Sequence, residues 1–471
     1  MGLTRQQRLV VILLAAGNLF VLLLICSFTA YSLRGLSAAQ VAGLATLPPT
    51  NTPRPTPIPT WTPTPTPTPY VTLTPTPYAL SGEEAATLDQ IEQEVARLRG
   101  LQILHPVPRW KVTPLQLRQH YADTFIGEEW EAKARPLAIA LAAFDFMLPD
   151  TDLLELWRES FYKWIAGFYK PDTEEIFLVS DAYTLGVMEQ VVFAHEFDHA
   201  LEDQHFDLET LGLDITSEPG YSDRFLAVDA LIEGDAELLQ EQYVKAYISE
   251  EEARLWFNQY LKIRFPLTGS TPPVLGELSE FPYDEGRDFV QALYEHGGWE
   301  LVNRAYATPP ASTEHILHPH RYLSGDQPVA VSVAPLSDTL GSEWRLVYES
   351  TVGEFVLGLY LRNHLGADEA DQAVAGWGGD RCAVYYNDTT GQTVMLLRAI
   401  WDTTADARQF LDAYESYADA RFGHSASHVT EEVSCWQGTD VVCVTRQEDS
   451  VTVVLGPNQA TVDGVLAVGL P

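Results

Sequence analysis

The chain contains few cysteines for its length. Only four of its 471 residues are cysteine, and they form no Cys-x-x-Cys pair. A zinc site built from thiolates is therefore excluded, because such sites take two to four closely spaced cysteines. Cys435 and Cys443 flank a turn-like sequence and could bridge a hairpin in an oxidising compartment, which would leave Cys382 free.

Basic residues are also scarce. The chain has 29 Lys and Arg against 65 Asp and Glu, which gives a formal net charge of −36 at pH 7. So acidic a protein repels the phosphates of nucleic acids, and we expect no nucleic-acid partner. All the acidic residues follow residue 79, so the first part of the chain differs in kind from the rest.

That first part carries no acidic residue and contains two segments of different composition. Arg5 and Arg8 precede an uncharged apolar stretch over residues 9–33, which is long enough to cross a bilayer as a helix. Residues 34–80 contain a Thr-Pro repeat that favours extended polyproline II and cannot build a core. We predict a cytoplasmic segment over 1–8, a transmembrane helix that is either kept or cleaved, and a stalk. The protein is then single-pass in the cell membrane, with its folded part extracytoplasmic.

The most informative motif lies in the acidic part. Residues 195–199 read His-Glu-Phe-Asp-His, an HExxH motif within a segment whose apolar residues follow helical spacing. His195 and His199 are one turn apart on one helix face, so both imidazoles can reach a single metal ion. Glu196 stands beside the first histidine, where it can take a proton from a metal-bound water. This pattern predicts Zn²⁺ and hydrolysis of a peptide or protein substrate.

A catalytic zinc site needs a third protein ligand, and two residues compete for that role. His205 has the metzincin spacing, HExxHxxGxxH, but Glu202 stands where that pattern needs a helix-breaking glycine. A continuous helix would carry His205 about 9 Å along the axis from His199. Glu233 lies on the apolar stripe of a second predicted helix, where a carboxylate is costly unless it is paired or metal-bound. The absence of that glycine and the position of Glu233 on an apolar stripe favour Glu233 as the third ligand.

HExxH on one helix with a glutamate on the next resembles the gluzincins, the thermolysin-like zinc peptidases. The resemblance implies that Glu233 is the third ligand and that Glu237, one turn later, orients a ligand histidine. Asp235 would point elsewhere on the helix, into solvent. Two features depart from thermolysin: the interval between His199 and Glu233 is longer, and Glu237 replaces an aspartate.

A second unusual segment, residues 309–322, contains three histidines, an arginine and a tyrosine. Thermolysin-like enzymes use a histidine and a tyrosine from beyond the zinc helices to stabilise the oxyanion. By that resemblance we assign the oxyanion role to His318, with Arg321 or Tyr322 assisting. A capped turn with surface histidines, or a second metal site, remains open for this segment.

The remaining pattern predicts an α+β protein with two folded domains. Residues 81–330 form a mainly helical, zincin-like domain, and residues 331–471 form a smaller α+β domain. Residues 176–180 read as a strand, either the edge strand that binds substrate backbone in zincins or an ordinary core strand. Apolar spacing predicts helices over residues 84–99, 114–122, 128–145, 151–168, 186–206, 222–249, 284–296 and 404–422.

We therefore expect a membrane-anchored, extracytoplasmic zinc peptidase. Two alternatives remain open. A non-catalytic cell-surface binding module would use the motif as a vestigial or structural metal site. A zinc hydrolase that acts on a non-peptide amide would share the same ligands.

Overall fold

The computed structural model describes residues 80–471, apart from the segments 119–127, 212–221, 265–271, 430–432 and 470–471. The described residues all belong to one compact unit. The predicted transmembrane helix and all but the last residue of the predicted stalk lie outside the described residues. Within the part that is described, no helix is long and apolar enough to span a membrane.

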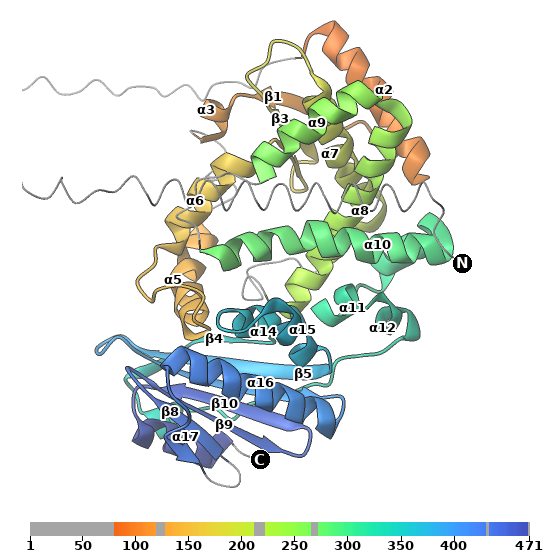
Figure 1. Cartoon of the computed structure of the whole chain (residues 1–471). Coiled ribbons are helices and arrows are strands. Elements are labelled where there is room, and N and C mark those ends of the chain that lie inside the picture. The colour runs from red at the N-terminus through yellow and green to blue at the C-terminus, as the bar shows by residue number, and fades with distance from the viewer. Residues whose placement is uncertain (1–79, 119–127, 212–221, 265–271, 430–432, 470–471) are drawn as a thin grey trace, which may run out of the picture. The chain divides into compact units, whose positions relative to one another are not determined.

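The described residues between 80 and 330 are mainly helical, as the sequence predicts (Figure 1). Most predicted helices are present, although α10 is longer than expected and α9 was not predicted. Residues 119–122 of the helix predicted over 114–122 lie outside the described residues. The helices are α2 (Gly82–Arg99), α3 (Pro114–Gln116), α5 (Glu128–Ala143), α6 (Leu153–Trp164), α7 (Val187–Phe206), α8 (Asp223–Tyr247), α9 (Glu250–Arg264), α10 (Pro273–Ala307), α11 (Thr313–Leu317) and α12 (Pro319–Ser324).

Helices α7 and α8 form the centre of this helical part. Helix α7 packs on α8 and α2, and α8 packs most extensively on α10. The close approach of α8 and α10 depends on Gly234 and Gly286: a Cβ atom built on Gly234 would lie 2.2 Å from the backbone of Gly286. Helix α10 is kinked at Gly297 and Gly298, whose backbone angles are not helical.

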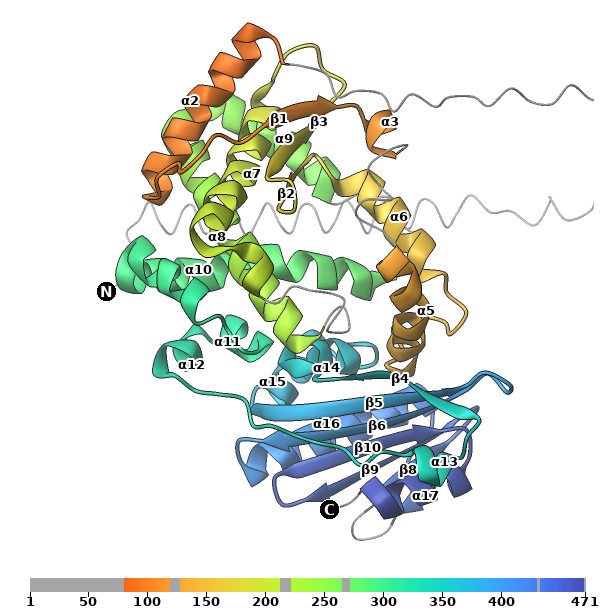
Figure 2. The same cartoon turned by 180° about the vertical axis from the view of Figure 1, so that it is seen from behind.

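A small sheet lies beside α7 (Figure 2). Its strands are β1 (Arg109–Val112), β2 (Gly167–Lys170) and β3 (Glu175–Val179), in the order β1-β3-β2. Strand β3 pairs in parallel with β1 and antiparallel with β2. The strand predicted over residues 176–180 is therefore present, but it is the central strand. Because both of its sides are already paired, the substrate-binding alternative for this strand is wrong, and the edge strands are β1 and β2.

The C-terminal part is built on a seven-stranded antiparallel sheet of order β4-β5-β6-β10-β9-β8-β7. Its elements are β4 (Trp344–Ser350), α14 (Gly353–Arg362), α15 (Ala367–Val374), β5 (Trp377–Asn387), β6 (Gln392–Trp401), α16 (Thr404–Phe422), β7 (His428–Val429), β8 (Val433–Gln437), β9 (Val441–Gln447), β10 (Ser450–Gly456) and α17 (Gln459–Gly469), with α13 (Ser337–Leu340) before them. The predicted α+β class is confirmed.

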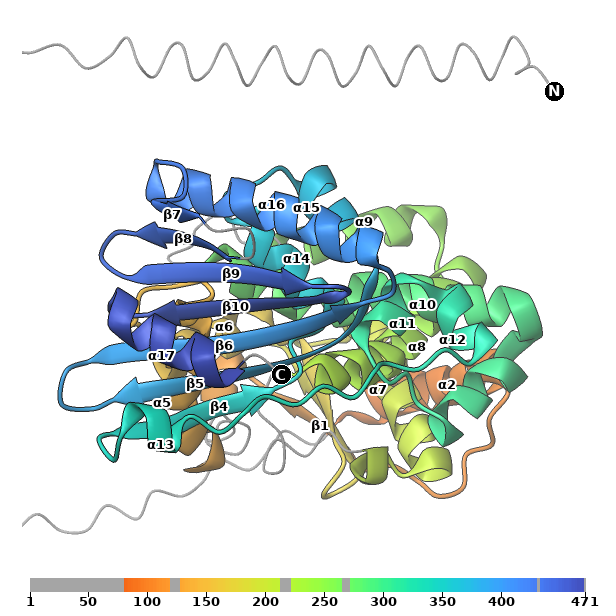
Figure 3. The ribbon, with the colours of Figure 1, turned by 90° about the horizontal axis from the view of Figure 1, so that it is seen from below.

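Each face of this sheet has its own apolar core. One face carries Val384 and Leu397 into a core shared with α14, α16 and the helical part of the chain. The other face is covered by α17, which lies across β9 and β10 (Figure 3). Cys435 and Cys443 are directly opposite each other on β8 and β9 and form a disulfide, while Cys382 is free and buried.

Candidate metal centre

Two helices bring three metal-ligating side chains together. His195 and His199 lie one turn apart on α7, and Glu233 faces them from α8. The Nε2 atoms of the two histidines are 3.2 Å apart. Glu233 Oε2 lies 3.2 Å from Nε2 of His195 and 3.5 Å from Nε2 of His199. The structure thus places all three predicted ligands in one group.

The spacing of these three atoms fits a tetrahedral zinc ion. Ligand atoms about 2.0–2.2 Å from a tetrahedral centre lie about 3.3–3.5 Å from one another. The observed separations of 3.2, 3.2 and 3.5 Å agree with that value. Two imidazoles and one carboxylate are also the donor set of catalytic zinc sites that leave a fourth position open. The residues present therefore fit Zn²⁺.

The three side chains are largely buried, and their charges interact with one another. Burial opposes the charge on Glu233, but the positive charge of His199 and hydrogen bonds from both rings hold the pKa of this carboxyl below its ordinary value. One turn earlier on the same face of α8, burial and the charge of Glu233 raise the pKa of Asp229 to about 8. With Glu237, these residues form a row of acidic residues along one face of α8.

Glu196 lies between the metal group and the small sheet. Its side chain is largely buried, and its Oε2 accepts a hydrogen bond of 2.9 Å from the backbone N–H of Tyr169 on β2. Burial raises the pKa of Glu196, while the neighbouring histidines oppose that rise. A Cβ atom on Gly167 would lie 3.2 Å from Glu196 Cγ, so β2 can approach α7 this closely because a glycine is present.

The carboxylate that orients the imidazole of His199 belongs to Glu202. Its Oε2 lies 3.0 Å from His199 Nδ1, so the Nε2 atom of that ring faces Glu233. The sequence predicted this role for Glu237, but Nδ1 of His199 faces Glu202, and Nδ1 of His195 has no hydrogen-bond partner among the described residues. Instead, Glu237 accepts a hydrogen bond of 2.9 Å from Gln240. Glu202 has the advantage of position, because it follows His199 by one turn on the same helix.

Asp235 is fully buried, which corrects the prediction that it is solvated. It faces away from the metal group, toward α2, where the Arg99 guanidinium binds both of its oxygens at 2.9 and 2.7 Å. A buried acid of this kind needs a buried base from elsewhere in the chain, and no local pattern in α8 reveals that partner.

Tyr283 is a site residue that the sequence did not indicate. It lies on α10, and its ring stacks on that of His195 with centroids 6.2 Å apart and an interplanar angle of 21°. Burial and the negative charges of Glu233 and Asp229 raise the pKa of its hydroxyl well above the ordinary value. Its position depends on how α10 crosses α8, so no motif around residue 283 could have identified it.

The structure does not place His318 at the metal group. His318 Nε2 lies 2.9 Å from Glu354 Oε1 on α14. Earlier in the same segment, Thr313 donates hydrogen bonds from its backbone N–H (2.7 Å) and its hydroxyl (2.6 Å) to Asp223, the first residue of α8. Asp223 precedes Glu233 by ten residues, about 15 Å along the helix. The segment thus connects the start of α8 to α14.

The assisting residues predicted there have structural partners too. Arg321 pairs with Glu314, Asp326 and Asp402, and the Tyr322 hydroxyl donates to the Thr308 carbonyl. These contacts fix the loop.

His205 contacts the backbone carbonyl of Gln102, with 2.8 Å between Nε2 and the oxygen. Helix α7 continues without a break to Phe206, as expected from the absence of a glycine at position 202. His205 therefore lies outside the metal group.

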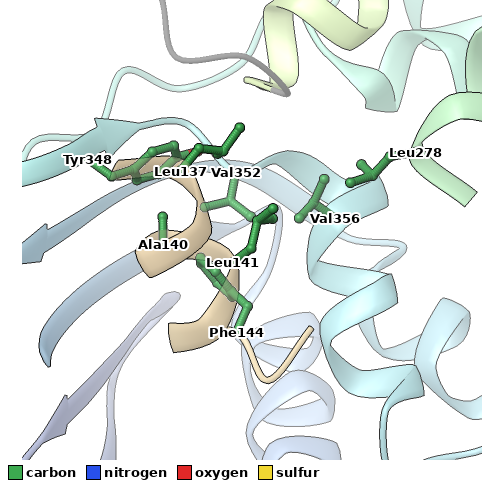
Figure 4. A pocket seen from close by; sticks show the side chains of 8 residues that line it. All are labelled: Leu137, Ala140, Leu141, Phe144, Leu278, Tyr348, Val352 and Val356. Carbon is green, nitrogen blue, oxygen red and sulfur yellow. The ribbon is translucent and has the colours of Figure 1, made fainter. Parts of the chain in front are cut away.

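An apolar hollow lies elsewhere, among α5, α10, β4 and α14 (Figure 4). None of the side chains that line it is a charged group or a metal ligand, so it offers no hydrolytic chemistry. They are Leu137, Ala140, Leu141, Phe144, Leu278, Tyr348, Val352 and Val356.

Comparisons with known proteins reach only the C-terminal sheet. Residues 344–466, from the start of β4 into α17, match a domain of unknown function (DUF8575). No curated protein and no solved structure matches the chain. The metal centre lies outside the matched residues.

Proposed function

We propose that the protein is a zinc-dependent peptidase of the gluzincin kind, anchored in a membrane by residues 9–33 and acting outside the cytoplasm. The observation that carries the proposal is the arrangement of His195, His199 and Glu233, whose donor atoms have tetrahedral spacing, with Glu196 next to them. When bound, zinc supplies Lewis acidity toward a water and a peptide carbonyl.

Glu196 acts as the proton carrier. As a buried carboxylate with a raised pKa, it takes a proton from the attacking water and returns it to the leaving amine. The proton then never leaves the site. The hydroxyl of Tyr283, rather than His318, supplies a hydrogen bond to the developing oxyanion, since its ring stacks on a ligand histidine.

The substrate backbone pairs with the edge of β2. This strand is the last one of its sheet, and its residue Tyr169 directs the backbone N–H away from β3 and toward Glu196. A peptide that extends the sheet at this edge would place its backbone beside the proton carrier. The role that the sequence analysis considered for residues 176–180 therefore passes to residues 167–170.

The extracytoplasmic location is supported by the sequence and by the disulfide. The apolar stretch and the Thr-Pro repeat are features of a stalked membrane protein. The pairing of Cys435 with Cys443 is what an oxidising compartment permits.

The experiment measures zinc content and protein hydrolysis on the purified full-length protein. We expect about one zinc per chain and cleavage of an unstructured protein such as casein. Glu196→Gln should keep zinc and lower hydrolysis by about 10²–10⁴-fold. Glu233→Ala should lose zinc, whereas the matched variants Glu237→Ala and His205→Ala should keep it.

Two results would overturn the proposal in different ways. A wild-type protein that binds no zinc after loading has no metal centre. A protein that holds zinc but cleaves nothing, with Glu196→Gln indistinguishable from wild type, is a binding module with a structural metal site.

A further inference from the structure

A chain of buried polar contacts runs from the metal centre to the N-terminal helix of the folded unit. His199 Nδ1 contacts Glu202 Oε2 at 3.0 Å, and Glu202 Oε1 accepts a hydrogen bond of 2.8 Å from the Tyr306 hydroxyl. The same hydroxyl lies 2.9 Å from Asp235 Oδ2, and the guanidinium of Arg99 binds both oxygens of Asp235. Four helices, α7, α10, α8 and α2, thus contribute one residue or more each.

Arg99 forms an ion pair with Asp235, with 2.7 Å between Nη2 and Oδ2. It is the last residue of α2 and is fully buried. Its Nη1 donates to Asn303 Oδ1 at 2.7 Å, and its guanidinium lies over the Trp299 ring, 4.4 Å from the centroid. With donors directed at two helices and a ring against its face, the guanidinium has one defined position.

The orientation of the His199 ring depends on this series of hydrogen-bonded side chains. Glu202, as a carboxylate, only accepts hydrogen bonds, and its two oxygens face two different donors. With Tyr306 holding one oxygen, the other receives the Nδ1–H of His199, which fixes the tautomer and leaves Nε2 for a metal. Without the Tyr306 hydroxyl, the Glu202 side chain can turn and the ring loses its support.

We propose that Arg99 and Tyr306 are positioning residues of the metal centre: Arg99 fixes Asp235, both fix Tyr306, and Tyr306 holds Glu202 against His199. The proposal rests on the function proposed above and deepens it. It assigns to α2, more than 90 residues before the HExxH motif, a part in metal affinity.

A different interpretation of the same cluster is a second cation site. Oxygens of Asp198, Glu202 and Asp235 lie within 4.8 Å of one another, and neither oxygen of Asp198 has a hydrogen-bond partner among the described residues. However, the guanidinium of Arg99 already occupies both oxygens of Asp235. A cation would have to displace it, so we assign the positive charge of this cluster to Arg99.

The first test is Tyr306→Phe, which removes one hydroxyl and keeps the ring stacked on Phe206, with centroids 4.3 Å apart. Zinc affinity is measured by chelator competition, and the unfolding of the metal-free protein is measured in parallel. We expect zinc to bind about 10–100-fold more weakly. The matched control is Tyr414→Phe, which removes a buried hydroxyl hydrogen-bonded to Tyr360, far along the chain. It should alter stability but leave zinc affinity unchanged.

The second test is Arg99→Lys, which keeps the charge but cannot contact both oxygens of Asp235 and also Asn303. We expect weaker zinc binding and an altered visible absorption of the cobalt-substituted protein, because cobalt reports ligand geometry. Arg97→Lys is the control on the same helix, since Arg97 is exposed and contacts Tyr247.

The outcomes separate the two proposals. Unchanged zinc affinity and cobalt spectrum in Tyr306→Phe and Arg99→Lys would overturn the positioning role while the peptidase proposal stands. Two tightly bound metal ions per wild-type chain, one lost in Asp198→Asn, would also overturn it in favour of a cation at the cluster. A wild-type protein that binds no zinc would overturn both proposals, and its zinc content is measured before any variant is made.

Discussion

The backbone N–H of Tyr169 donates a hydrogen bond of 2.9 Å to Glu196, so the edge strand β2 and the HExxH helix are in direct contact. In the proposed mechanism, this contact sets where Glu196 lies relative to the strand that would receive a peptide. It also makes the position of Glu196 sensitive to the packing of β2 on α7.

Gly167→Ala should disturb that packing. The added Cβ would lie 2.6 Å from Val192 Cγ1 and 3.2 Å from Glu196 Cγ, so β2 must move away from α7. We expect a loss of stability of about 1–3 kcal/mol and a drop in the kcat of proteolysis at full zinc occupancy. Gly82→Ala, where nothing lies within 4 Å of the added atom, is the control. Full activity of Gly167→Ala would mean that β2 does not position Glu196.

The crossing of α8 and α10 makes a second prediction. An added methyl group at Gly234 would meet the Gly286 backbone at 2.2 Å, next to Glu233, the proposed third ligand. Gly234→Ala should therefore destabilise the protein by about 3 kcal/mol or more in urea unfolding. Gly276→Ala, also a helical glycine but with open space around it, should stabilise by roughly 0.5–1 kcal/mol. Equal effects at the two positions would contradict the tight crossing.

Local patterns were enough to predict the two helices of the metal centre. The predicted helix 186–206 is observed as Val187–Phe206, and the predicted helix 222–249 as Asp223–Tyr247. The spacing of His195 and His199 is a property of one helix, so it could be derived from the sequence. The burial of Glu233 on the apolar face of α8 could be derived in the same way.

Other site residues depend on contacts between distant segments. Tyr283 reaches His195 because α10 crosses α8, and Arg99 reaches Asp235 across 136 residues of chain. Strand β3 is central and β2 lies at an edge because β3 also pairs with β1. No pattern within residues 167–180 reveals that pairing. The histidine-rich segment misled the sequence analysis because its composition resembles a catalytic loop, whereas its hydrogen bonds connect α8 to α14.

Tyr283→Phe tests the residue that the sequence did not indicate. Removing the hydroxyl takes a hydrogen-bond donor from the oxyanion while leaving the ring on His195. We expect kcat to fall by about 10²–10³-fold with zinc content and KM nearly unchanged. Tyr294→Phe, on the same helix but with its ring tilted against that of Trp299, should keep its activity. If both variants cleave at the wild-type rate, the oxyanion is stabilised elsewhere.

Asp223 provides a prediction about pH that does not involve the metal centre. Its carboxyl begins α8 and accepts two hydrogen bonds from Thr313, and burial raises its pKa from 3.8 to about 7. Because the folded protein binds this proton more tightly than the unfolded chain does, the group favours folding most below about pH 4. That contribution is lost as the pH rises from 4 through 7.

Asp223→Asn cannot lose a proton at this position, so its stability should lack this component. We expect the free energy of unfolding of Asp223→Asn relative to wild type to be constant below pH 4 and to rise between pH 4 and 7. The rise should be on the order of a few kcal/mol, and urea unfolding at each pH measures it. Asp368→Asn, in the exposed first turn of α15, is the control and should run parallel to wild type. A parallel curve for Asp223→Asn as well would show that Asp223 is ionised in the folded protein and that the junction between α8 and α11 is held by a charged carboxylate.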